Sequence, residues 1–181
     1  MKTSWLFTGL AAIGFTVLLG GAALSGDNRN FHAHLSGDEE VPPNETRAQG
    51  QAIFHLGKDD TALNLTVNGD TALKYKLIVA NISNVVAAHI HHGDEGVNGP
   101  IVAFLAGPFP AGGGRSDGIL AQGAITAANL VGPLAGHPLS DLVTLMRNGE
   151  TYVNVHTNDG VPPTNTGPGD FPGGEVRGQI E

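Results

Sequence analysis

The segment "ALKYKLIVANI", residues 72–82, has the alternating pattern from which the fold class can be predicted. Apolar side chains stand at every second position from Leu73 to Val79, and Lys74 and Lys76 lie between them. Successive side chains of a β-strand point to opposite faces of a sheet, so this alternation predicts a strand with one buried face.

Similar short runs, separated by glycine and proline, occur along most of the remaining chain, which contains 27 Gly and 11 Pro. Such spacing of strands and turns is typical of an all-β fold, a Greek-key sandwich or barrel of about seven or eight antiparallel strands. The run at 50–69 reads as a hairpin with its turn at 57–60. The other expected strands are "FHAHL" (31–35), "VVAAHIHH" (85–92), "PIVAFL" (100–105), "ILAQGAI" (119–125), "TYVNVHT" (151–157) and "EVRGQI" (175–180).

One segment, "HPLSDLVTLMRNG" at 137–149, departs from the strand pattern. Its apolar residues recur at helical spacing, Pro138 suits a first helical turn, and Asn148 with Gly149 suits a C-terminal cap. We therefore expect one short helix near 138–148. The apolar residues in question are Leu139, Leu142, Val143 and Met146.

Composition limits the function classes. The 181 residues suffice for one domain with a core, and 9 Lys+Arg against 17 Asp+Glu give a net charge of −8. A nucleic-acid-binding protein needs a basic surface to meet phosphates, so no nucleic-acid partner is expected. The chain has no cysteine, which excludes disulfides and thiolate metal sites and leaves His, Asp and Glu as metal ligands.

The first 25 residues resemble an export signal. Lys2 is followed by an uninterrupted apolar stretch that ends in small residues, with Ala23 and Ser25 placed for cleavage before Gly26. The alternative is an uncleaved membrane anchor, since about 20 apolar residues can span a bilayer. We expect a signal at 1–25, a β domain at 26–181, and a secreted, periplasmic or cell-surface location. Membrane contact would then occur only through an uncleaved N-terminal segment.

The densest group of chemically active residues is "HIHH" at 89–92. His89 and His91 share one strand face about 6–7 Å apart, close enough for both imidazoles to bind one ion, whereas His92 points to the opposite face. His156, in another predicted strand, is the third candidate, and a site of three imidazoles favours copper or zinc. The alternative is that these histidines only form hydrogen bonds near strand ends.

His32 and His34 show the same spacing in the first predicted strand. If that strand lies beside the others, one of them would add a fourth ligand. The sequence does not decide this point.

The segments "FHAHLSGDEEVPP", "AAHIHHGDEGVNGPIV" and "YVNVHTNDG…FPGGEVRGQI" resemble, in order, the motif blocks of the CHRD domain family, which is known from chordin and from single-domain exported microbial proteins. The resemblance runs from Phe31 to Glu181. It places His89, His91 and His156 at the characteristic histidine positions of the family. His32 and His34 depart from the usual first strand. A distant similarity of pattern to copper/zinc superoxide dismutase also exists.

The resemblance implies an exported binding module, not an enzyme, with one copper or zinc ion at His89, His91 and His156 or an extracellular protein as partner. A structural ion pair between Glu175 and Arg177 is expected in the last strand, because residues at i and i+2 share a face. Two alternatives stay open. One is a copper enzyme like superoxide dismutase, and the other is a metal-free structural or adhesion module at the cell surface.

Overall fold

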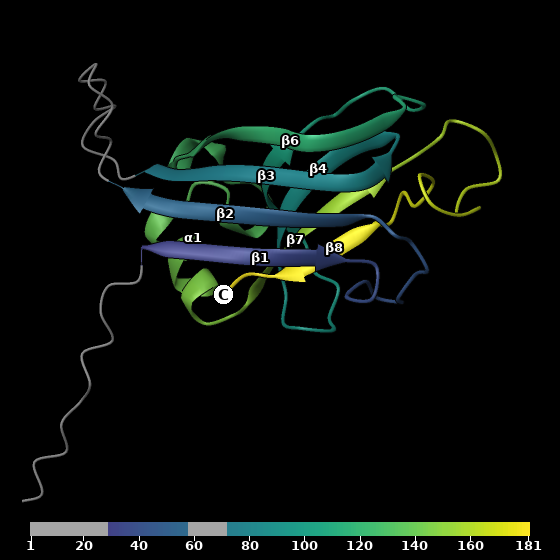
Figure 1. Ribbon diagram of the computed structural model, residues 1–181. Coiled ribbons are helices and arrows are strands. Elements are labelled where there is room, and N and C mark those ends of the chain that lie inside the picture. The colour runs from purple at the N-terminus through teal and green to yellow at the C-terminus, as the bar shows by residue number, and fades with distance from the viewer. Residues whose placement is uncertain (1–28, 58–71) are drawn as a thin grey trace, which may run out of the picture.

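The structure is a computed structural model that describes residues 29–57 and 72–181. The expected signal at 1–25 and the second half of the expected hairpin at 50–69 lie outside these residues. Within them the chain forms eight strands, one α-helix and two short 3-10 turns (Figure 1). The strands are β1 (Asn30–Ser36), β2 (Gln49–Gly57), β3 (Ala72–Ser83), β4 (Val85–His92), β5 (Ile101–Ala106), β6 (Arg115–Ile125), β7 (Thr151–Thr157) and β8 (Val176–Gln179).

All eight strands belong to one antiparallel sheet in the order β5-β4-β7-β8-β1-β2-β3-β6. Its two edges, β5 and β6, approach each other, so the sheet curves into a nearly closed barrel. A hydrogen bond ties the ends together: the Tyr75 hydroxyl on β3 donates to the Leu105 carbonyl on β5 at 2.7 Å. The prediction of an all-β sandwich or barrel with about eight antiparallel strands is confirmed.

The core lies on the concave face of this sheet, and alternation along each strand fills it. In β3, Leu73, Leu77 and Val79 are buried while Lys76 is exposed, as the opening pattern predicts. Burial of such side chains contributes about 1.5–3 kcal/mol each relative to exposure. In β1, Phe31, Ala33 and Leu35 are likewise buried, and the residues between them face outward.

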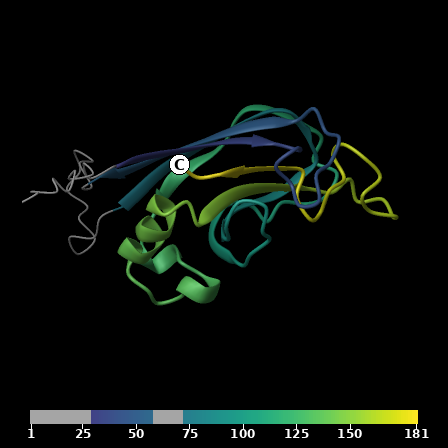
Figure 2. The same ribbon diagram turned by 90° about the horizontal axis from the view of Figure 1, so that it is seen from below.

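The predicted helix is also present, as α1 (Leu139–Arg147). The four apolar residues that predict it are buried in the core, Leu145 is partly buried, and Pro138 and Asn148 are its N-cap and C-cap. Figure 2 shows α1 and the two turns, Ala127–Asn129 and Gly132–Leu134, to one side of the curved sheet. The turns were not predicted. Among the described residues, no helix has the length and apolar character that a bilayer crossing needs.

Strand β6 is longer than predicted, since it begins at Arg115 and not at Ile119. Its first residues, 115–118, follow three consecutive glycines and lack the apolar alternation that predicts a strand. Arg115 and Ser116 pair with Ser83 and Ile82 at the end of β3, after an irregularity in the register. Pairing with a long neighbour therefore extends the strand through Gly118, which has a φ of +95°.

Candidate metal centre

The pairing of β4 with β7 brings His89, His91 and His156 together. In this register His89 lies opposite Asn154, and Ala87 lies opposite His156. Because side chains alternate along a strand, Ile90 points into the core while His89 and His91 point outward. The site therefore lies on the outer face of the barrel, where the loops at either end of the strands cover it.

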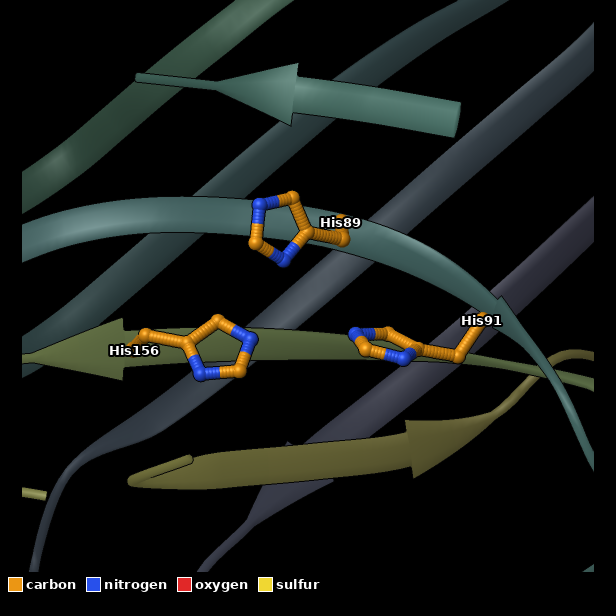
Figure 3. A group of neighbouring side chains, drawn as sticks. All are labelled: His89, His91 and His156. Carbon is orange, nitrogen blue, oxygen red and sulfur yellow. The ribbon is translucent and has the colours of Figure 1, made fainter. Parts of the chain in front are cut away.

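The three imidazoles lie next to one another although they come from two strands. Their ring centroids are 4.8 Å apart for His89 and His156, 5.5 Å for His89 and His91, and 5.9 Å for His91 and His156. His89 and His91 are only 7% and 8% exposed, and His156 is half-buried. Figure 3 shows that one nitrogen of each ring points toward the space between the rings.

Backbone carbonyls fix which nitrogens are free to bind a ligand. Nδ1 of His91 lies 2.9 Å from the Gly99 carbonyl, and Nδ1 of His156 lies 3.0 Å from the Pro172 carbonyl. A carbonyl only accepts hydrogen bonds, so each Nδ1 carries the proton and each Nε2 keeps its lone pair. Both Nε2 atoms, and Nδ1 of His89, are buried without a hydrogen-bond partner.

The geometry of these nitrogens suits a metal ion. The candidate ligand atoms all lie within 4.8 Å of one another. An ion that binds each nitrogen at about 2.0–2.1 Å requires nitrogens about 3.3–3.6 Å apart, so modest ring rotations would bring them into range. A hydrogen bond from the second nitrogen of a ligating histidine to a carbonyl is the usual outer support of such a site.

The electrostatics also favour the ligand form of these side chains. Burial, together with the neighbouring His156 and His91, lowers the pKa of His89 to about 4. Burial likewise lowers the pKa of His91 and of His156, partly offset by their hydrogen bonds to Gly99 and Pro172. The imidazoles are therefore neutral at pH 7, and an incoming cation would not have to displace their protons.

A stack of side chains holds His91 from the other side. The Tyr152 ring lies parallel to it, 4.9 Å between centroids at 10°, and the Arg177 guanidinium lies 3.5 Å from the Tyr152 centroid. Arg177 is fully buried and donates to the carbonyls of Asp94 and Val97, each at 3.0 Å. It thereby fixes the loop 93–99, whose Gly99 orients His91.

The predicted ion pair between Glu175 and Arg177 is wrong. Glu175 instead accepts hydrogen bonds from Thr46 and Thr157, both at 2.6 Å, and from the backbone N–H of Gly169 at 2.9 Å. Strand β8 begins only at Val176, so strand alternation does not extend to Glu175 and does not place it on the same face as Arg177.

The histidines of β1 do not join the site. His32 and His34 are exposed, and the group of metal-competent residues among those described contains only His89, His91 and His156. His92 is not in this group either, which agrees with the prediction that it points to the opposite face of the strand from His89 and His91. The two β1 histidines open onto a separate cavity of about 240 Å³, which is also lined by Glu39, Glu95, Gln179 and Glu181.

Sequence reasoning missed two polar residues beside the site, Glu40 and Asn154. Glu40 is 5% exposed, and its carboxylate accepts a hydrogen bond of 3.3 Å from the Asn154 amide. Nothing in the sequence distinguishes Glu40 from the exposed Glu39 next to it. Asn154 stands two positions before His156 in β7 and so shares its strand face, but nothing in the sequence gives it a role.

Phe104 on β5 borders the open side of the site, where its ring meets His89 edge-on at 4.8 Å while its side chain stays 49% exposed.

Comparison with curated proteins and with solved structures gives no match for this chain. A family model of the CHRD domain matches residues 31–180, nearly the whole chain, including both strands that carry the three histidines. The protein therefore belongs to the CHRD domain family, a family of binding modules.

Proposed function

We propose that this protein is an exported CHRD binding module that holds one copper or zinc ion through His89, His91 and His156. The ligand atoms would be Nδ1 of His89 and Nε2 of the other two histidines. The single observation that supports this most strongly is that these three nitrogens are buried, lack hydrogen-bond partners and face one another.

Energetics supports a ligand at this position. A buried polar atom without a partner costs about 1–3 kcal/mol, and here three such atoms share one small space. One ion would satisfy all three at once. Imidazole ligands favour copper or zinc over magnesium or calcium, which prefer oxygen.

Export rests on a separate observation, the basic start and apolar stretch of residues 1–25. A module outside the cytoplasm would meet its metal or its protein partner there. Three protein ligands leave a coordination position for water or a partner group. A redox copper enzyme and a metal-free adhesion module are the alternatives that the test below separates.

Metal content tests the proposal. The purified chain is loaded with copper or zinc, dialysed extensively and analysed by mass spectrometry, beside the variants His89→Ala and His156→Ala. We expect about one ion per wild-type chain and a loss of that ion in both variants. His34→Ala, which changes an exposed histidine outside the triad, is the matched control and should keep the ion.

Absence of retained metal in folded wild-type protein would refute the metal site and favour adhesion. Retained copper that removes superoxide faster than the same concentration of free copper would favour the enzyme. Retained metal without that activity is the result that the binding module predicts.

A further inference from the structure

A buried carboxyl group is linked to the strands of the histidine triad through one hydrogen-bonded residue and takes no part in the proposed coordination. Glu40, in the loop between β1 and β2, accepts a hydrogen bond on Oε2 from the Asn154 amide on β7. Asn154 shares a strand face with His156 and lies directly opposite His89 in the sheet. One neutral side chain therefore connects the carboxyl group to the strands that hold the triad.

Two oxygen atoms of this pair lack a donor. Glu40 Oε1 and Asn154 Oδ1 are both buried without a hydrogen-bond partner. They face the same small space, because a Cβ atom added to Gly174 would lie 2.6 Å from the first and 2.5 Å from the second. A proton on Glu40 supplies the missing donor, since a protonated carboxyl group can donate to an amide oxygen. Acid and amide would then be joined by two hydrogen bonds.

The charges that face Glu40 support a bound proton. Burial, with a smaller contribution from the Glu175 carboxylate, raises the pKa of Glu40 to about 7, although hydrogen bonds to Asn154 and the Val41 backbone and the Arg177 guanidinium act in the opposite direction. In the sheet, the residue bonded to Glu40, Asn154, lies between His89 on β4 and Arg177 on β8. The His89 imidazole is neutral at pH 7 because burial lowers its pKa. The carboxyl group thus changes its charge readily near neutral pH.

We propose that a divalent ion bound by the histidine triad expels the proton of Glu40, whose carboxylate becomes the buried counter-charge of the ion. This inference rests on the proposed function. Three neutral imidazoles contribute no negative charge, and a buried cation without a counter-charge is unfavourable. A cation nearby favours the ionised form of a carboxyl group, and the released proton passes to the buffer.

Isothermal titration calorimetry with zinc measures the proton directly. Titrations at pH 6.5 in two buffers with different ionisation enthalpies give the number of protons released per zinc bound. With a pKa of about 7, Glu40 is mostly protonated at this pH. The wild-type chain should release between about one half and one proton more than Glu40→Gln, which keeps the shape but cannot ionise.

Glu39→Gln is the matched control, since it removes an adjacent but exposed carboxyl group and should release as many protons as the wild type. Equal proton release by the wild type and Glu40→Gln, with one zinc bound in each, would overturn the inference and leave the metal site intact. No zinc binding by the wild type would overturn the proposed function, and the inference with it.

Infrared difference spectroscopy of the wild type gives a second readout that does not depend on how the variant folds. The C=O stretch of a buried protonated carboxyl group should be present at pH 6.5 and should disappear when zinc saturates the site. A band that persists at saturation would overturn the inference.

Discussion

Acid should destabilise this protein in the absence of metal through the buried histidines, and His89 gives the clearest case. Burial lowers the pKa of His89 from its usual 6.5 to about 4. The His89 imidazole is therefore protonated below about pH 6.5 in the unfolded chain but only below about pH 4 in the folded chain. The stability that this residue contributes is fully present above pH 6.5 and is lost as the pH falls toward 4.

The size of the effect follows from the same two values. At about 1.4 kcal/mol per pH unit, the interval between 6.5 and about 4 corresponds to at most about 3.4 kcal/mol, and about 3 kcal/mol of it is lost between pH 7 and pH 4. His89→Gln replaces the imidazole by a group that does not titrate. We expect the wild type to lose about 3 kcal/mol more than this variant over that interval.

Urea denaturation at pH 7 and pH 4, in the presence of a chelator, measures both free energies of unfolding. Glu40 acts in the opposite direction: its pKa is raised to about 7, so its contribution is present below pH 4.5 and is lost as the pH rises through 7. Because Glu40 is present in both the wild type and His89→Gln, its contribution cancels when their losses of stability are compared. His55→Gln, at an exposed position, should behave as the wild type. An identical pH dependence in wild type and His89→Gln would refute the reasoning.

Three further predictions concern close packing and metal linkage. Gly99→Ala should lower the affinity for zinc, measured by calorimetry, at least about tenfold. The added Cβ would collide with the His92 carbonyl and so move the Gly99 carbonyl, which orients His91. An unchanged affinity would contradict this. Gly178→Ala should lower the free energy of unfolding in urea by at least about 2 kcal/mol, since its Cβ would collide with the His34 backbone between β8 and β1; a loss below about 0.5 kcal/mol would argue against that contact. Zinc at about one hundred times its Kd should stabilise the chain by about 2.7 kcal/mol in thermal unfolding, and an unchanged Tm would contradict specific binding.

Much of the fold could be predicted because alternation is a local signal. The run from Leu73 to Val79 identifies both the strand and its buried face, and the same rule identifies the face of His89 and His91. The helix could be predicted because its apolar spacing and both of its ends are encoded within a dozen residues. The group of three histidines followed from strand direction together with the family resemblance.

Other features depend on contacts between segments far apart in the chain, which no local pattern records. Glu40 is buried and Glu39 exposed because the loop after β1 turns one of two adjacent carboxylates toward Asn154, 114 residues away. Arg177 binds the loop 93–99 and not Glu175 because it lies over Tyr152 once β7 and β8 pair.

X-ray absorption spectroscopy of the zinc-loaded chain identifies the atoms that bind the metal. We expect a first coordination shell with three imidazole nitrogens at about 2.0–2.1 Å, and a reduced imidazole contribution in His156→Ala. A shell made of oxygen atoms alone, or one unchanged by His156→Ala, would show that the metal binds elsewhere and would contradict the account.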